Sequence, residues 1–537
     1  MTEKAHVEIV ILAPFFILAL GALIRQTTKT LPIPYTLTLL LIGTLFGFLL
    51  RIETWNDALR ESINMLGNFD PHLLLHVFLP PLVFESAASI EWHLFSQAKV
   101  YICCLAGPGL LLSSSLTGLV LYWLLNETSR FQDELVASDC SQNSWSFGAA
   151  LLLGCIMSAT DPVAVVSLLK ELGCKASLAV NIEGESLLND GTALVMYTIL
   201  VKIVEGDDSQ SIGDYFVTFL KMSVGGAIFG VSFGFLIVQW LRLVFNDSLT
   251  EITITLSGAY LCFFIAEYFL HISGVLAVVC LGLYFGQVGS TSISPEVFHF
   301  LEEFWQCLGY IGNTLIFVVA GIVIGYKLPM FPLAEFGKMM MIYLVSLVIR
   351  ALVIFSVYLV LKWLGYKLEF KDQIVAVWAG LRGAVGLSLA MLVFNNDFLC
   401  EPVREVVMFY TSGMVVMTIF LNAVTMPQLI SFLGLDSISP SKQLVFDQAM
   451  ATLYKCGQKQ EAMLKADHLF DSTIWDEARK YYFDVDHENV NANGNLPGVD
   501  NHRKLGREEI CRRVLMITKR SYWKQFQVRC WIRSTAF

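Results

Sequence analysis

Apolar stretches of roughly the length of a membrane-spanning helix recur along most of the sequence. About 20 such residues cross the hydrocarbon core of a bilayer. Lipid offers no hydrogen bonds to the backbone, so a chain with many such stretches folds as packed helices. We therefore expect an all-α, polytopic membrane protein with about thirteen transmembrane helices, near residues 7–25, 34–50, 72–90, 99–125, 147–170, 184–204, 212–242, 250–270, 273–289, 304–326, 336–364, 373–395 and 405–434.

The composition excludes several other classes of protein. Of the 537 residues, 55% are hydrophobic and 15% are charged, whereas soluble domains average about 25% charged residues. This excludes a soluble enzyme, a nucleic-acid-binding protein and a disordered protein. The sequence also shows no nucleophile–base constellation, P-loop or metal motif, so we predict no enzymatic activity and no cofactor.

The charge distribution divides the chain near residue 440. Residues 1–440 contain 20 Lys and Arg against 34 Asp and Glu, whereas residues 441–537 contain 16 against 12. We predict a transmembrane domain over 1–440 and a cytoplasmic helical region over 441–537, which begins a longer regulatory part. The basic tail places the C-terminus inside the cell. Its last helical stretch either binds a membrane surface or partner helix, or packs within a larger cytoplasmic region.

Thr160-Asp161-Pro162 interrupts one of the apolar stretches near its middle. Proline lacks an N–H and its ring clashes with the preceding turn, so we expect extended backbone with free carbonyls here. Transporters use such interruptions at membrane depth to bind ions. Alternatively, the proline only kinks the helix and Asp161 caps the following half. Both interpretations can hold together.

A second polar cluster lies in IEGESLLNDGTALVMY, residues 182–197. On a helix, Ser186, Asn189 and Asp190 share one face because they are spaced i, i+3 and i+4. The face offers a hydroxyl, an amide oxygen and a carboxylate, which are ligands suited to a small cation. A single carboxylate that holds either a proton or a cation is the minimum equipment for exchange. The alternative is that Asn189 and Asp190 form a polar pair that only fixes packing.

The third cluster is the glycine-rich stretch AVWAGLRGAVGLSLA, residues 376–390, around Arg382. Glycine loosens a helix and lets another backbone approach. Two interrupted spans, around Asp161 and around Arg382, predict a transporter with inverted repeats. The positive charge of Arg382 would neutralise both the carbonyl dipoles at the broken ends and the charge of Asp161. Alternatively, it lies at a loop boundary and follows the positive-inside rule.

Further charged residues lie inside apolar stretches. Arg350 has no acidic neighbour in the sequence, and a buried charge requires a partner. We expect Glu185 to pair with it and to tie two helices together. Glu85 and Glu267 each either make a structural hydrogen bond or belong to the ion path.

Gly226, Gly230 and Gly234 repeat at four-residue spacing in the span 212–242. Small residues at this spacing allow close packing of another helix. That helix belongs either to the same protomer or to a second one.

Five segments together resemble the signature segments of the monovalent cation:proton antiporters, in the Na⁺/H⁺ exchanger (CPA1) branch. They are FLPPLVFESA (78–87), ATDPVAVVSLLKELG (159–173), EGESLLNDGTALVMY (183–197), AEYFLHISGVLAVVCLG (266–282) and KDQIVAVWAGLRGAV (371–385). The resemblance covers about residues 10–435. The second and third segments are most similar to those of the plant plasma-membrane salt-tolerance exchangers and the sperm-specific exchangers.

The resemblance implies a fold with inverted repeats and two crossed broken helices, a homodimer and an elevator-like core. The core comprises the fourth to sixth and eleventh to thirteenth spans, and the dimer side comprises the first three and the eighth to tenth. Asp190 would hold the exchanged ion or proton, and Asn189 would support it and select one-for-one exchange. The resemblance further implies that Ser186, Thr160 and Asp161 complete the ion site, with Asp190, Asn189 and Asp161 as Na⁺ ligands. It also implies that Glu185 pairs with Arg350 and that Arg382 steadies the broken helices.

The expected function is electroneutral antiport of Na⁺ for H⁺, which regulates intracellular pH and sodium. The expected location is the plasma membrane, and a flagellum or cilium for the sperm type. K⁺/H⁺ or Li⁺/H⁺ exchange is an alternative because the same ligands allow it. A cation or proton channel is a further alternative, which would lack obligatory coupling between the two ions.

Overall fold

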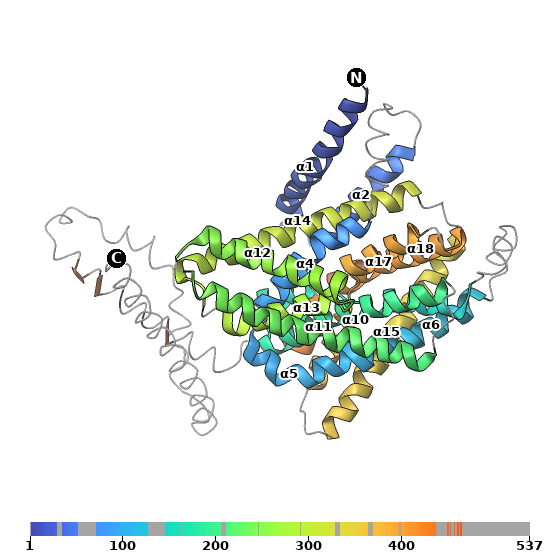
Figure 1. Cartoon of the computed structure of the whole chain (residues 1–537). Helices are drawn as coiled ribbons and strands as arrows, with labels where there is room; N and C mark the ends of the chain where they lie inside the picture. Colours follow the sequence, from blue (N-terminus) through green and yellow to red (C-terminus); the bar gives the residue numbers. More distant parts are fainter. Residues whose placement is uncertain are drawn as a thin grey trace. The chain divides into compact units, whose positions relative to one another are not determined.

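Helices occupy the apolar stretches in the computed structural model of this chain (Figure 1). The structure describes residues 2–28, 35–51, 71–126, 145–161, 163–205, 211–244, 246–289, 292–327, 333–363, 369–396, 399–435 and isolated positions between 448 and 463. No strand occurs within these ranges. The prediction of an all-α protein is therefore confirmed.

The helices of the first half begin at the N-terminus and end after the second polar cluster. They are α1 (Thr2–Thr28), α2 (Tyr35–Arg51), α4 (Pro71–Ser89), α5 (Trp92–Cys104), α6 (Leu110–Asn126), α8 (Phe147–Ile156), α9 (Val163–Glu171) and α10 (Ala176–Val204). A π-helical turn, η1 (Leu105–Gly109), joins α5 to α6.

The second half of the described residues is also helical. Its helices are α11 (Ile212–Leu241), α12 (Ser248–Phe264), α13 (Gly274–Val288), α14 (Pro295–Lys327), α15 (Leu333–Trp363), α16 (Phe370–Trp378), α17 (Ala384–Phe394), α18 (Glu401–Met417) and α19 (Val424–Leu433). The π-helical turns η2 (Ile265–Phe269) and η4 (Thr418–Ala423) follow α12 and α18. Seven helices among the described residues are long and apolar enough to cross a membrane. The count of about thirteen crossings stays a prediction.

The chain divides into two compact units, residues 1–435 and 436–537. The first contains all the helices named above. The second holds the helical region expected over 441–537, which lies almost wholly outside the described residues.

Two helices are interrupted, and their interruptions meet. Residues 157–162 separate α8 from α9, and residues 379–383 separate α16 from α17. The backbone N–H of Asp161 donates to the carbonyl of Leu381 over 2.9 Å, which joins the two breaks directly. A Cβ on Gly383 would lie 2.1 Å from the Asp161 side chain, so only glycine allows this approach. Pro162, which predicted the first break, lies outside the described residues.

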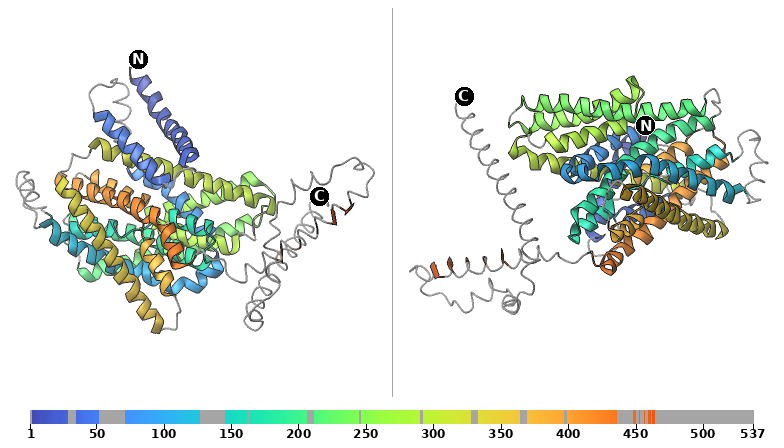
Figure 2. Two further views of the ribbon diagram at one scale, coloured as in Figure 1. Left: turned by 180° about the vertical axis from the view of Figure 1, so that it is seen from behind. Right: turned by 90° about the horizontal axis from the view of Figure 1, so that it is seen from below.

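The glycine face of α11 packs inside the first unit. A Cβ on Gly230 would lie 2.1 Å from the carbonyl oxygen of Ala277 in α13, and one on Gly226 would lie 2.7 Å from that of Ser273. The structure therefore assigns this face to another helix of the same protomer. The helices α11, α12 and α13 lie side by side, as Figure 1 and Figure 2 both show.

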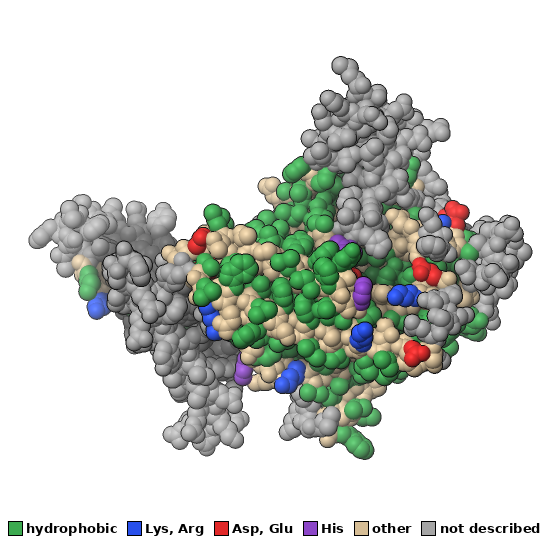
Figure 3. All heavy atoms as spheres, viewed as in Figure 1, with side chains coloured by type: hydrophobic (Ala, Val, Ile, Leu, Met, Phe, Trp, Pro, Cys, Tyr) green, Lys and Arg blue, Asp and Glu red, His purple; other side chains and the backbone are tan. Residues whose placement is uncertain are grey.

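The opposite side of α11 exposes large apolar side chains. Ile228 is 64% exposed and Leu236 is 61% exposed. Figure 3 shows hydrophobic side chains spread over the described surface, with few charged ones among them. Such a surface is stable in lipid, where apolar side chains meet apolar chains and little water.

The close approach at Gly230 gives a testable prediction for stability. In Gly230→Ala the new methyl group would overlap the Ala277 carbonyl, and overpacking of this kind costs about 1–3 kcal/mol. The melting temperature in detergent should fall. Gly213→Ala is the matched control, because it lies on the same helix with no atom within 4 Å of its Cβ position. An equal change in both variants would contradict the packing argument.

Candidate functional site

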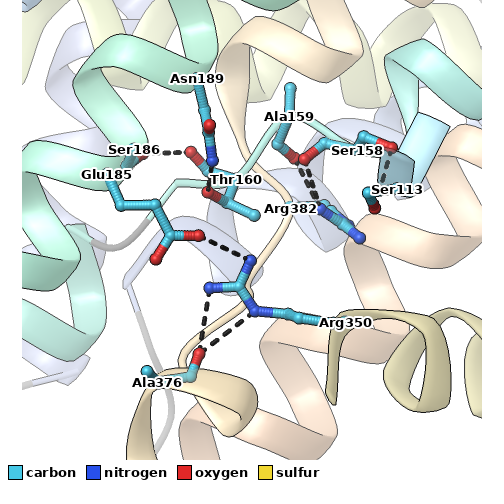
Figure 4. Close-up of polar contacts among 10 residues, drawn as sticks. All are labelled: Ser113, Ser158, Ala159, Thr160, Glu185, Ser186, Asn189, Arg350, Ala376 and Arg382. Atoms are coloured by element: carbon cyan, nitrogen blue, oxygen red, sulfur yellow. Dashed lines mark hydrogen bonds and ion pairs between the residues drawn. The ribbon is translucent and has the colours of Figure 1, made fainter. Parts of the chain in front are cut away.

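The helix α10 holds the first broken helix at its break. Ser186 donates its hydroxyl to the backbone carbonyl of Thr160, and Asn189 Nδ2 donates to Thr160 Oγ1 over 3.3 Å (Figure 4). All three residues are buried. The predicted i, i+3 spacing thus brings two polar side chains of α10 onto one residue of the break. Asn189 Oδ1 has no hydrogen-bond partner in the described part of the chain, which leaves a buried acceptor oxygen beside Thr160.

Arg382 lies in the second break and binds the first. Its Nη1 donates to the carbonyls of Ser158 and Ala159, each over 3.0 Å (Figure 4). These carbonyls belong to the residues just after α8, where continuous helical hydrogen bonding has stopped. A guanidinium suits this position because it offers several donors and stays charged. The side chain therefore binds the broken end of another helix.

The Glu185 carboxylate of α10 pairs with Arg350 of α15. Arg350 Nη1 lies 3.1 Å from Glu185 Oε1, and the two side chains are 12% and 5% exposed. Arg350 Nε and Nη2 also donate to the carbonyl of Ala376 in α16, over 3.2 and 3.0 Å (Figure 4). A Cβ on Gly380 would lie 2.5 Å from the Arg350 side chain. This pair thus joins α10, α15 and the second broken helix.

A cavity of about 360 Å³ reaches the crossing point. Asp161, Ser186 and Asp190 line it, together with Glu85 on α4 and Glu302 on α14. Thr160 and Asn189 are buried beside the cavity and do not line it. The structure therefore separates the five residues expected to form the ion site into three that face the cavity and two that lie behind it.

Asp161 both caps a helix and faces the cavity. Its Oδ1 accepts a hydrogen bond from the backbone N–H of Val163 over 3.1 Å, at the start of α9. A carboxylate at a helix N-terminus is stabilised by the free N–H groups there. The capping interpretation of Asp161 is therefore seen in the geometry, and its role in ion binding stays a prediction.

Residues of the π-helical turn η4 support the second break, and the sequence did not single them out. Thr418 Oγ1 accepts from the backbone N–H of Arg382 over 3.1 Å. Asn422 Nδ2 donates to the carbonyl of Trp378 over 3.1 Å, and its Oδ1 accepts from the hydroxyl of Tyr343. The signal was available, because Thr418 and Asn422 are polar residues four apart within an apolar stretch.

Comparison with protein families decides the identity of this arrangement. The family described as "Sodium/hydrogen exchanger, transmembrane" matches residues 15–431. The chain belongs to the sodium/hydrogen exchanger family. This is a transporter family, and its match spans both broken helices and α10, so the resemblance drawn from the five segments is confirmed.

Two plant proteins are among the similar relatives. Sodium/hydrogen exchanger 8 of Arabidopsis thaliana is 32% identical over 467 residues, which are 85% of this chain and 60% of the relative. Sodium/hydrogen exchanger 7 of the same plant is 34% identical over 439 residues, which are 80% of this chain and 37% of the relative. The chain thus spans 60% and 37% of the lengths of these two relatives.

A solved structure shows the same fold. The sodium proton antiporter MjNhaP1 from Methanocaldococcus jannaschii matches with a TM-score of 0.64 and 19% sequence identity, over 80% of this chain and 99% of that chain. The predicted antiporter fold is therefore confirmed, and the chain is a multi-pass membrane protein of this family.

The buried ion pair yields a prediction for stability. Glu185→Gln or Arg350→Met should each destabilise the protein by about 3–5 kcal/mol, because each leaves one buried charge without its partner. The double variant should cost less than the sum of the two, with a coupling of about 1–3 kcal/mol. Thermal unfolding of the four proteins in detergent measures this cycle.

An exposed ion pair provides the control. Lys175 Nζ lies 2.7 Å from Glu369 Oε1, with the side chains 46% and 63% exposed. Glu369→Gln should cost no more than about 1 kcal/mol. Additive effects at Glu185 and Arg350 would contradict the proposed coupling.

Proposed function

We propose that this chain exchanges Na⁺ for H⁺ across a membrane, one for one. The observation that supports it is the meeting of Asp161, from the first break, and Asp190, from α10, on one cavity at the crossing of two broken helices. Oxygen ligands of this kind suit a small hard cation. The family of the chain and the names of its plant relatives support the same choice of ions.

In this proposal Asp190 holds either a proton or Na⁺. A carboxylate that binds one of them is closed to the other, so loading with Na⁺ releases H⁺ and the reverse. Asp161 and Asn189 are the further proposed Na⁺ ligands, and Asn189 has a free acceptor oxygen within the described structure. Ser186 and Thr160 complete the site by fixing the break against α10.

Arg382, Glu185 and Arg350 act on structure in this proposal. Arg382 keeps a positive charge at the broken end of α8, and the Glu185–Arg350 pair ties α10 to α15. They maintain the geometry of the site and do not bind the exchanged ion, which Asp190 binds.

The proposal extends to the whole protein. In this proposal the protein works as a homodimer in the plasma membrane. Its C-terminal region lies in the cytoplasm, where a regulatory domain or partner binds. The core of α5–α10 and α15–α19 moves like an elevator against α1, α2, α4 and α12–α14. The support is the fold, the family and the cavity between these two groups of helices.

Removal of the exchanged carboxylate tests the central assignment. Asp190→Asn should abolish Na⁺-driven proton movement in proteoliposomes, because an amide neither releases a proton nor offers a negative charge. A pH-sensitive dye inside the vesicles measures the exchange. Ser232→Ala is a control on α11, where the hydroxyl bonds only its own helix over 2.8 Å. Na⁺-driven proton movement that persists in D190N would contradict the assignment.

A shared carboxylate also predicts competition between the two ions. The apparent affinity for Na⁺ should weaken as pH falls, by about tenfold per pH unit where the proton dominates the site. Exchange rates at graded Na⁺ and external pH measure it. An apparent Na⁺ affinity that is independent of pH would exclude a shared site.

The same vesicles distinguish the alternatives. K⁺ or Li⁺ in place of Na⁺ tests cation preference directly. A current that reverses at the Nernst potential of a single ion would indicate a channel, whereas one-for-one exchange gives no current.

A further inference from the structure

The cavity that reaches Asp161 and Asp190 contains one basic side chain among its described lining residues, Lys170. Lys170 lies in the last turn of α9, the helix that begins at the first break. Five carboxylates line the same cavity and would attract a cation, namely Glu85, Asp161, Glu183, Asp190 and Glu302. The side chain of Lys170 carries a single positive charge, like the cation that the cavity would admit.

Lys170 pairs with Glu183 at the exposed end of this cavity. Its Nζ lies 3.6 Å from Glu183 Oε2, and the two side chains are 59% and 14% exposed. Ser186, one turn further along α10 from Glu183, is only 3% exposed. Exposure therefore falls from Lys170 through Glu183 to the crossing point, so this pair lies between solvent and the ion site.

Two of the other cavity carboxylates, Glu85 and Glu302, come from a second set of helices. Glu85 belongs to α4, and its Oε2 would lie 3.1 Å from a Cβ on Gly309 of α14, so it is held against that helix. Glu302 also belongs to α14. The charges at the entrance thus come from two sets of helices, with Lys170 and Glu183 on one and Glu85 and Glu302 on the other.

The ammonium group reduces the negative potential that a cation meets on entry. Charges in a partly enclosed, low-dielectric cavity interact more strongly than charges on an open surface. The lysine ammonium is a compact point charge on a flexible stem, so it can leave Glu183 and return to it. An entering cation and the ammonium compete for the same carboxylate.

We propose that Lys170 is a tethered competitor cation that sets the apparent affinity of this exchanger for Na⁺. It does not bind the exchanged ion; it acts through Glu183 and the charge of the cavity entrance. The inference rests on the proposed Na⁺/H⁺ exchange. The opposing view is that Lys170–Glu183 is one of the exposed ion pairs that contribute little.

The test measures the KM for Na⁺ and the maximal rate in proteoliposomes at alkaline pH, where competition by protons is smallest. Lys170→Gln should lower KM about three- to tenfold with little change in maximal rate, because the competing charge is gone. Glu183→Gln should raise KM, because a carboxylate that attracts the cation is gone. Both differences should shrink as an inert salt such as choline chloride is added.

Two further variants complete the design. Lys170→Arg restores the charge and should return KM towards the wild-type value. Lys175→Gln removes an equal charge from a similarly exposed lysine that pairs with Glu369 and does not line the cavity, so its KM should match the wild type. Lys170 is exposed, so these variants should fold, and melting temperatures in detergent verify this.

The outcomes distinguish a failure of the role proposed for Lys170 from a failure of the proposed Na⁺/H⁺ exchange. Opposite shifts of KM in K170Q and E183Q, with K175Q unchanged, support the role of Lys170. Unchanged values, shifts in the same direction, or a change in maximal rate alone would overturn it while wild-type exchange still stands. If the wild-type protein itself moves no protons in response to Na⁺, the proposed function fails first.

Discussion

The contact of Arg382 with the broken end of α8 is the interaction on which this structure depends. Ending a helix inside a membrane leaves carbonyls that lipid cannot satisfy. Here the carbonyls of Ser158 and Ala159 each receive a hydrogen bond from one guanidinium nitrogen, over 3.0 Å. The same residue donates its backbone N–H to Thr418, so its own break is satisfied as well. The two interruptions are therefore stable because each supplies hydrogen-bond partners to backbone groups of the other. The cavity can then end at polar groups.

The buried pair of Arg350 and Glu185 follows the same rule and lies beside this contact. Arg350 uses one nitrogen for Glu185 and two for the carbonyl of Ala376, which brings the charge of α15 to the second broken helix. Removing a charge from such a network leaves its partner buried and uncompensated. Asp161 and Asp190 differ, because they face the cavity rather than a basic side chain. The charges that hold the crossing are thus paired, whereas Asp161 and Asp190 have no ion-pair partner among the described residues.

Much of the fold and of the candidate site was predictable from the sequence. Charged residues inside apolar stretches are energetically costly and are therefore usually functional. The interruptions at Asp161 and Arg382 and the face of α10 followed from proline, glycine and helical spacing. The family followed from five ordered segments and was confirmed. The spacing of residues could not predict which side chains line the cavity. Asn189 and Asp190 are adjacent in the sequence, yet only Asp190 lines it. Nor could it place Thr418 and Asn422 at a break in another helix, because that contact depends on tertiary packing.

The distribution of contacts bears on how such a site could open to two sides. The hydrogen bonds and ion pair at the crossing join α8, α10, α15, α16 and the breaks beside them, which all belong to the proposed core. The cavity wall formed by α4 and α14 contributes Glu85 and Glu302. A movement of the core against these two helices would change the cavity and leave the contacts of Arg382, Glu185 and Arg350 intact. The polar contacts at the crossing therefore lie within the part that is proposed to move, and the cavity lies along its edge.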